Sequence, residues 1–412
     1  MRQTSMTDFP AHDPDTGHLG RPGSPREVLG AFLKLGLTSF GGPVAHLGYF
    51  RAEFVERRRW LDDRSYSDLV ALCQFLPGPA SSQVGFALGL GRAGWLGALA
   101  AWAGFTLPSA LLLVLFAFGI EHWAGLAASG LAHGLKVAAV AIVAQAVWGM
   151  SRSLCPDRMR AGIGIAAALL ALALPSAPGQ IGAIVAGGLI GRWGLRLGRL
   201  PPSQHRDYGV SRRMGAALLM LCGALLVALP VLAADARSML LPAIATVYQA
   251  GALVFGGGHV VLPLLQAGVV QTGWVGSEAF LAGYGAAQAV PGPLFTFAAY
   301  LGALMPAPLG GWAGALAMLL AIFAPAVLLV AGALPFWEAL RQRAGIQRAL
   351  AGINAAVVGL LGAALYDPVW TSAIHTRADA GLALAAFGLL AVARVSPVIV
   401  VGLAAAAGAW LA

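Results

Sequence analysis

Residues 36–43 read Gly36-Leu37-Thr38-Ser39-Phe40-Gly41-Gly42-Pro43, and residues 251–258 read Gly251-Ala252-Leu253-Val254-Phe255-Gly256-Gly257-Gly258. The same glycine and phenylalanine pattern therefore occurs twice, once near position 36 and once near position 251. Both stretches interrupt long apolar segments, where consecutive glycines release the backbone from a helical path. This repeated break decides the fold, because it indicates two related halves within one chain.

The repeat continues downstream of these breaks. Pro77-Gly78-Pro79 returns as Pro291-Gly292-Pro293, Gly94-Trp95 returns as Gly311-Trp312, and Gly134 returns as Gly352. The spacing between mates changes by only a few positions over about a hundred residues, which indicates a duplication. The apolar segment at 214–233 has no mate and is predicted to be a connecting helix.

The composition is that of a membrane protein. Apolar residues make up 58% of the chain and charged residues only 10%, whereas a soluble domain carries about 25% charged residues. Apolar stretches long enough to cross a bilayer as helices recur, for example at 95–119 and 126–150. No period-two alternation of the kind a membrane β-barrel needs is visible. The expected class is an all-α polytopic membrane protein.

Four parts are expected along the chain. They are a disordered cytoplasmic tail at 1–25, an N-terminal membrane repeat at 26–200, a basic loop with the connecting helix at 201–238, and a C-terminal membrane repeat at 239–412. A single extra crossing after an even number of crossings places the second half upside down. Inverted-topology repeats of this kind are the plan of many secondary transporters.

The glycine and proline motifs can be broken spanning helices or re-entrant hairpins. Residues 66–76 and 80–90, on either side of Pro77-Gly78-Pro79, are each too short to cross a bilayer alone. If these segments are hairpins, the arginine-rich loop at 51–64 falls on the cytoplasmic side, and the loop at 267–279, which lacks Lys and Arg, falls outside. The charge distribution therefore favours hairpins.

Several functional classes find no support in the sequence. The eight histidines show no metal-ligand spacing, and the three cysteines form no CxxC pair, so no metal, cofactor or disulfide framework is expected. Most of the basic residues are arginines in short loops, which fits topology control better than nucleic-acid binding. No enzyme motif stands out, and a membrane-embedded enzyme is a remote alternative.

Two stretches carry a family resemblance. Residues 32–47, which include Lys34 and the Phe40-Gly41-Gly42-Pro43 break, resemble the opening signature of the chromate ion transporter family. Residues 73–83, around Pro77-Gly78-Pro79, resemble its second signature, and both return in the second half at 255–259 and 287–297. The resemblance covers roughly residues 28–365 and corresponds to the long, two-domain form of the family.

The resemblance implies a transporter in the bacterial inner membrane that exports chromate, is driven by the proton-motive force and confers chromate resistance. Sulfate has the same tetrahedral dianion shape, so transport of sulfate or another oxyanion, by uptake or exchange, is the alternative. A passive anion channel ranks third, because inverted repeats with mid-membrane breaks favour alternating access. The expected partners are the oxyanion and the lipid bilayer; a homodimer is left open, and no nucleic acid is expected.

An oxyanion transporter must replace hydration by oriented donors and still release the ion. Helix N-termini created by the two breaks offer unpaired backbone N–H groups, and glycine lets an anion approach the backbone closely. Ser81, Ser82 and Gln83 add side-chain donors after the first Pro-Gly-Pro turn, whereas the second turn offers Thr296 alone. The two halves are therefore expected to contribute unequally. The alternative is that these glycines and prolines serve only packing and kinks.

Both lysines of the chain belong to the first half. Lys34 and Lys136 lie in apolar stretches, whereas their repeat mates are Gln249 and Asn354. A lysine at membrane depth faces a pathway or snorkels to an interface. Arg51 and Arg92 are expected to gather dianions in a vestibule, although the mixed-charge stretch at 51–64, which places Glu53 and Arg57 four residues apart, also suits a solvated helix face. The histidines just past the breaks, His46 and His259, are candidate proton carriers, although a lone histidine is more often structural.

The candidate substrate-binding residues are Lys34, Phe40, Gly41, Gly42, Pro43, His46, Arg51, Gln74, Pro77, Gly78, Pro79, Ser81, Ser82, Gln83, Arg92, Lys136, Gly256, Gly257, Gly258, His259, Gln288, Pro291, Gly292, Pro293, Thr296 and Asn354.

Overall fold

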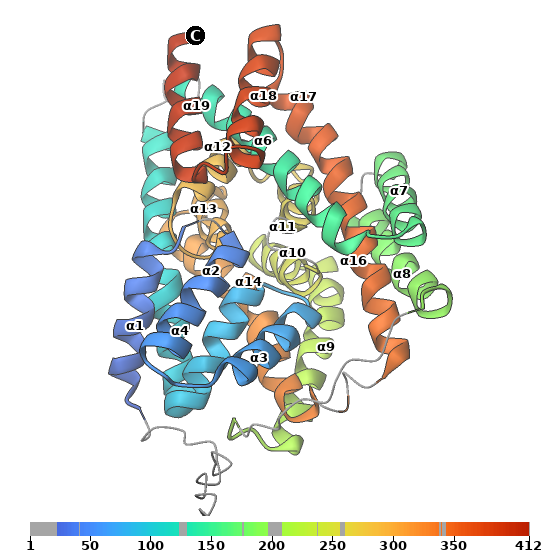
Figure 1. Ribbon diagram of the computed structural model, residues 1–412. Helices are drawn as coiled ribbons and strands as arrows, with labels where there is room; N and C mark the ends of the chain where they lie inside the picture. Colours follow the sequence, from blue (N-terminus) through green and yellow to red (C-terminus); the bar gives the residue numbers. More distant parts are fainter. Residues whose placement is uncertain are drawn as a thin grey trace, which may run out of the picture.

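The computed structural model describes residues 23–40, 42–122, 130–174, 177–196, 208–236, 238–255, 260–337, 339 and 343–411. Within these residues the chain is helical and contains no strand, which confirms the predicted class (Figure 1). The predicted tail lies almost entirely outside the described residues.

The first half runs from α1 to α8. Its elements are α1 (Pro25–Thr38), α2 (Gly42–Phe50), the π-helix η1 (Arg51–Arg57), α3 (Asp63–Phe75), α4 (Ala80–His122), α6 (Gly130–Leu154), α7 (Arg158–Ala173) and α8 (Ala177–Gly194). The long α4 is two helices joined by a turn, because Ala93 and Gly94 leave helical backbone angles.

The second half follows the connecting helix α9 (Arg212–Ala234). Its elements are α10 (Leu240–Ala252), α11 (Val261–Leu265), η3 (Gln266–Val270), α12 (Ser277–Ala289), η4 (Leu294–Thr296), α13 (Phe297–Leu304), α14 (Gly311–Ala333), η5 (Leu334–Phe336), α16 (Ala344–Ala364), η6 (Leu365–Trp370), α17 (Thr371–Ala373), α18 (Arg377–Ala391) and α19 (Pro397–Leu411).

Local signals in the sequence set several helix starts. The Ser24 hydroxyl accepts a hydrogen bond from Glu27 N–H at the start of α1, where proline occupies the first turn. Asp62 caps α3 in the same way, and Thr376 with Asp379 forms a capping box at α18. Residues close in sequence therefore set where these helices begin, whereas the packing of the helices on one another depends on residues far apart in sequence.

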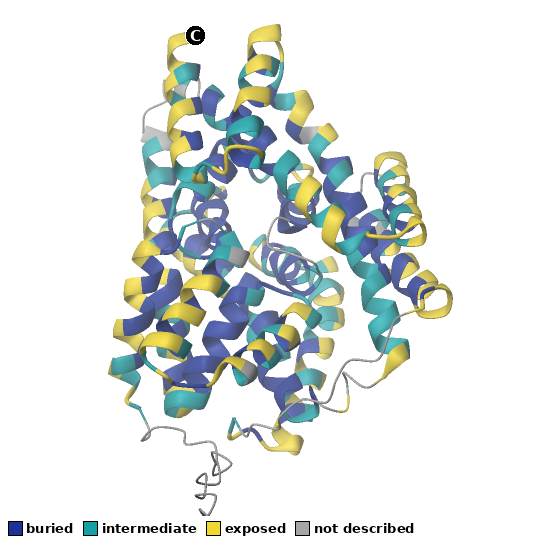
Figure 2. Cartoon of the chain, viewed as in Figure 1, coloured by how far each residue is buried: buried dark blue, intermediate teal, exposed yellow. Residues whose placement is uncertain are grey.

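Five helical segments among the described residues are long and apolar enough to cross a membrane. They lie at Ala80–Gly119, His133–Leu154, Arg212–Ala234, Gly311–Phe336 and Ala344–Ala373. Large apolar side chains such as Leu111, Ile165 and Val227 are exposed on the outside of the bundle (Figure 2). An apolar exterior of this kind suits lipid, so the chain is a multi-pass membrane protein.

The second half is inverted relative to the first. The repeat mates α4 and α14 pack side by side, with Phe118 near the end of α4 against Trp312 at the start of α14 (5.3 Å between ring centroids). Trp102, earlier in α4, packs against Phe323, later in α14 (5.8 Å). The two mates therefore run antiparallel, as inverted repeats require.

The last two helices of each half pack against a helix of the other half. Gly134 on α6 packs against the backbone of Ala404 on α19, and Gly187 on α8 packs against the backbone of Gly352 on α16. Small residues at these crossings let the helix backbones approach closely, the usual basis of helix association in lipid. The bundle is consequently interlocked rather than built from two separable halves.

The interrupted segments fold back on themselves. Glu27 at the start of α1 pairs with Arg58, which follows η1, at 3.9 Å, and with Arg92, near the α4 turn, at 3.2 Å. The chain therefore returns twice to the neighbourhood of the first turn of α1, once at the end of η1 and once near the turn in α4. In the second half the Tyr300 hydroxyl donates to Ala279 O at 2.7 Å, so α13 likewise returns alongside α12. The chain thus folds back at these three turns, as the hairpin prediction requires, whereas residues 256–259 lie outside the described part; re-entry of these segments into the membrane stays a prediction.

We expect the loop at 51–64 and the loop at 267–279 to face opposite sides of the membrane, the first being cytoplasmic. Ala52 and Thr272 are exposed in these loops and suit single-cysteine labelling after the three native cysteines are replaced. An impermeant maleimide should label Thr272→Cys in intact cells and Ala52→Cys only after permeabilisation. Labelling of Ala52→Cys in intact cells would refute this orientation.

Candidate functional site

The Pro-Gly-Pro turn of each half is bonded to the glycine break of the other half. Gly78 N–H donates to Val254 O at 2.6 Å, and Gly292 N–H donates to Ser39 O at 3.0 Å. Gly78 and Gly292 are repeat mates, and so are Ser39 and Val254. The four motifs therefore meet at one place, which we call the crossed-motif centre.

The two central glycines of this centre are required by their backbone conformation. Gly78 has a φ of 119° and Gly292 a φ of 104°, in the region that favours glycine. A Cβ at Gly78 would lie 2.9 Å from Gln83 Nε2, and one at Gly292 would lie 2.8 Å from Ser109 Oγ. Because both N–H groups are used between the halves, they are not free donors for an anion. The remaining backbone donors belong to the first turns of α4 and η4.

Buried side chains around the centre form hydrogen bonds with one another and with the motif backbone. His46 Nδ1 lies 3.3 Å from Ser81 Oγ, and its ring packs edge-on against Phe105. Gln83 Nε2 donates to Pro77 O at 2.8 Å. The Thr296 hydroxyl donates to Pro293 O at 2.8 Å, so the one hydroxyl expected from the second half is already engaged.

Other buried polar atoms near the same motifs have no hydrogen-bond partner among the described residues. They are Ser39 Oγ, His46 Nε2, Ser82 Oγ, Gln83 Oε1, Thr106 Oγ1 and Gln288 Nε2. Buried polar groups are normally satisfied, so such a group of atoms indicates a site for a polar ligand. All except Gln83 Oε1 can donate, and His46 Nε2 does so when Ser81 donates to Nδ1. Ser39 and Thr106 were not among the predicted residues, although Ser39 lies within the first signature at residues 32–47.

The centre contains donors but no charged side chain among its described residues. None of residues 42–50, 72–90, 100–112 or 285–300 is Asp, Glu, Lys or Arg. An anion there would be held by hydroxyl, amide and imidazole groups and by two helix N-termini. Neutral donors can replace part of an ion's hydration without trapping it.

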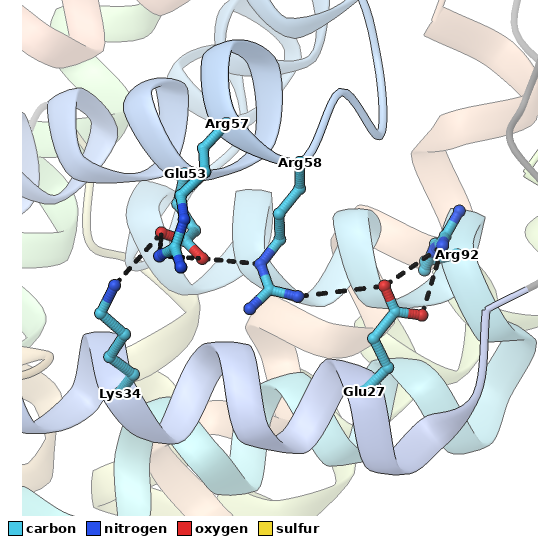
Figure 3. Close-up of polar contacts among 6 residues, drawn as sticks. All are labelled: Glu27, Lys34, Glu53, Arg57, Arg58 and Arg92. Atoms are coloured by element: carbon cyan, nitrogen blue, oxygen red, sulfur yellow. Dashed lines mark hydrogen bonds and ion pairs between the residues drawn. The ribbon is translucent and has the colours of Figure 1, made fainter.

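The cations gather instead at the end of the molecule where α1 begins (Figure 3). Glu53 is buried and accepts hydrogen bonds from Arg58 at 2.6 Å and Arg57 at 3.0 Å, and it pairs with Lys34 at 3.5 Å. Four cations face two carboxylates, so the group keeps two positive charges. We call these six residues the ion network: Glu27, Lys34, Glu53, Arg57, Arg58 and Arg92.

Electrostatics hold Glu53 in its charged form. Burial alone raises the pKa of this carboxyl, but hydrogen bonds from Arg58 and Arg57 and the nearby charge of Lys34 outweigh burial and lower its pKa below the ordinary value. The predicted four-residue pairing of Glu53 with Arg57 is present, within a π-helix rather than an α-helix.

Arg51 and Arg92 are already engaged with groups of this chain. Arg51 is exposed and donates to Asp63 at 2.6 Å and to Glu56. Arg92 pairs with Glu27 and lies over the Trp60 ring. A dianion would therefore compete with carboxylates for both guanidinium groups.

The remaining candidates are scattered. Gln74 is exposed, unlike its buried-amide mate Gln288; Asn354 is half-buried on α16; and Lys136 is buried at the other end of the molecule. Phe40 and Pro43 are half-buried beside the first break, and Gly42 has a φ of 78°. Gly41, Gly256, Gly257, Gly258 and His259 lie outside the described residues.

Sequence comparison places this chain in a known family. The family profile described as Chromate transporter matches residues 26–192 and again residues 241–409. The chain belongs to the chromate transporter family. The double match agrees with the duplication, and no solved structure gives a significant match.

Family relatives resemble the chain over most of its length. A chromate transport protein of Pseudomonas aeruginosa is 30% identical over 87% of this chain and 84% of its own. A probable chromate transport protein of Synechococcus elongatus is 28% identical, covering 82% and 83%. A chromate transport protein of Cupriavidus metallidurans is 27% identical, covering 82% and 81%. All three are named as transport proteins, and this family member is a transporter rather than an enzyme.

Replacing Gly78 or Gly292 by alanine should destabilise the fold by about 1–2 kcal/mol, because an L-residue is strained at these positive φ values. Thermal unfolding of the purified protein in detergent measures the effect. Gly381→Ala, in the interior of α18 where a Cβ meets nothing within 4 Å, is the matched control and should lose no stability. Unchanged melting temperatures for both motif variants would contradict the crossed arrangement.

Glu53→Gln should lower the free energy of unfolding by about 1–3 kcal/mol at neutral pH, because it removes a buried acceptor of charged hydrogen bonds. A lowered pKa means that the Glu53 contribution is complete above the unfolded value of about 4.3 and is lost as pH falls through the folded value. The difference in melting temperature between parent and variant should therefore shrink in acid. Glu56→Gln alters an exposed pair and should show little difference at any pH. A Glu53 effect that does not change with pH would count against the charged network.

Proposed function

We propose that this protein exports chromate across the bacterial inner membrane as a secondary transporter driven by the proton-motive force. The proposal gives the crossed-motif centre the role of substrate site and the ion network the role of cytoplasmic vestibule. Three relatives are named for chromate transport, which favours this oxyanion. The inverted repeat supports alternating access, since the two ends of such a fold can open in turn.

The unpartnered buried donors at the crossed-motif centre carry the proposal. A tetrahedral dianion has four acceptor oxygens and no donor, so it complements a site where Ser39, Ser82, Thr106 and Gln288 each have a donor to spare. These atoms are buried, so an ion reaches them only when one end opens. A transporter that works by alternating access encloses its substrate in this way, whereas an open pore does not.

The ion network complements the neutral centre. Its surplus of two positive charges matches a dianion, and charged clefts raise the local concentration of an oppositely charged substrate. Lys34 is the network member nearest in sequence to the Phe40 break, four residues before Thr38 at the end of α1. In this proposal Lys34 leaves Glu53 to accompany the ion toward the centre.

The decisive experiment is counterflow in proteoliposomes. Vesicles containing the purified protein are preloaded with chromate or sulfate, and entry of the labelled ion is followed with and without an imposed pH gradient. Chromate counterflow that responds to the gradient supports the proposal. Sulfate counterflow alone would move the assignment to the second oxyanion, and flux without counterflow would indicate a channel.

Removing single donors at the centre should weaken substrate binding. Ser82→Ala and Thr106→Val should each raise the KM for chromate roughly tenfold, because a hydrogen bond to a charged acceptor contributes about 1.5–3 kcal/mol. Ser153→Ala is the matched control, since this exposed hydroxyl bonds only the α6 backbone. The test compares counterflow kinetics at equal protein density. Normal KM values in both centre variants would remove the substrate site from the crossed-motif centre.

A further inference from the structure

The α6 helix begins at the end of the molecule away from the start of α1 (Figure 1), and two contacts between a basic and an acidic side chain lie near this beginning. His133 Nε2 lies 2.6 Å from Asp379 Oδ1 on α18, and Lys136 Nζ lies 3.6 Å from Glu278 Oε1 on α12. Both basic residues belong to the first half, and both carboxylates belong to the second. We call these four residues the opposite-end cluster.

The two carboxylates of the cluster differ in their surroundings. Asp379 is buried and also accepts hydrogen bonds from the backbone N–H groups of His375 and Thr376, at 3.0 and 2.9 Å. Its capping box fixes it at the start of α18. The side chain of Glu278 is 73% exposed, whereas Lys136 is buried. Both carboxylates are therefore charged acceptors, but water can solvate Glu278 when it has no cation, whereas Asp379 then has only its backbone hydrogen bonds.

Other titratable groups lie on the elements that pack against α6. The ring of His375 stacks on His133 with centroids 6.4 Å apart, but His375 is exposed. Among the described residues of the elements packed on α6, the remaining titratable groups are Tyr284 on α12, Arg348 on α16, Tyr366 and Asp367 on η6, and Arg377 on α18, and α19 has none. Asp367 and Arg377 are exposed, and Arg348 lies at the far end of α16.

We propose that His133 is a proton-binding site whose charge decides which carboxylate Lys136 pairs with. When His133 carries a proton, it neutralises Asp379, and Lys136 stays with Glu278. When the proton leaves, Asp379 is a buried carboxylate without a cation. Lys136, three residues along the same helix face, is the cation that replaces it, and Glu278 is released.

The exchange is favoured by the difference in burial. A buried carboxylate without a cation is unfavourable, whereas Glu278, whose side chain is 73% exposed, is solvated when Lys136 leaves it. Lys136 therefore moves toward Asp379 once His133 is neutral.

Release of Glu278 frees the start of α12. This helix ends beside the crossed-motif centre, because it carries Gln288 and leads into the Pro291-Gly292-Pro293 turn. Proton binding thus closes this end of the molecule and proton loss loosens it. Its role in gating oxyanion release rests on the proposed function, whereas the switch itself does not.

Electron paramagnetic resonance distances can test the switch without any substrate. Spin labels at Gly276→Cys, before α12, and Leu403→Cys, on α19 beside α6, report the separation of these elements in a background lacking the native cysteines. The parent should show a short distance at an acidic pH, where His133 carries a proton, and a longer one at an alkaline pH, where it does not. Equal distances at both pH values would overturn the proposal, even if chromate transport is normal.

Variants separate the proton site from mere packing. His133→Gln should show the long distance at both pH values, whereas the matched variant His375→Gln should keep the pH response. Glu278→Gln changes an exposed side chain, is expected to fold, and should also show the long distance throughout. A pH response retained in His133→Gln or in Glu278→Gln would contradict the exchange. Loss of chromate counterflow with an intact distance change would instead count against the proposed function.

Discussion

A backbone group that leaves a helix inside a membrane must find a partner within the protein, because lipid offers none. The duplicated motifs break their helices and so create such groups. Gly78 N–H donates to Val254 O, and Gly292 N–H donates to Ser39 O, so each of these groups has a partner. Neither half can make these bonds alone, so the two halves must fold around each other. The exchange of α18 and α19 onto α6, and of α7 and α8 onto α16, follows the same interlocked plan.

Charge and polarity are distributed in a way that suits a transported dianion. A full cation at the centre would bind the ion tightly and delay its release, and without the ion it would be an unpaired buried charge. The centre therefore contains hydroxyl, amide and imidazole groups, while the ion network keeps its cations beside Glu27 and Glu53 at one end. Because these carboxylates already neutralise much of the charge, an arriving dianion exchanges partners rather than meeting bare cations.

Much of the architecture could be predicted from the sequence, because duplication and hydrophobicity are visible in one dimension. Spacing and charge predict the inverted halves, the hairpins and the Glu53–Arg57 pair, as well as the connecting helix α9, which has no repeat mate. Pairings between distant residues could not be predicted. Nothing local shows that the Gly78 amide is taken by Val254, that Lys34 meets Glu53, or that Gln74 is exposed while its mate Gln288 has a buried amide. Each of these depends on packing between elements.

An inverted repeat alone would make the two ends of the molecule equivalent, so direction must come from sequence differences between the halves. The first half supplies all the basic residues of both charged groups, whereas the second half supplies Asp379 and Glu278. At one end, the ion network lies within the first half and retains positive charge. At the other end, the two pairs connect the halves, and their charges cancel when His133 is protonated. A dianion is attracted to the first end and finds no such surplus at the second. Under the proposed function, this difference lets a symmetrical scaffold take up the ion at one face and release it at the other.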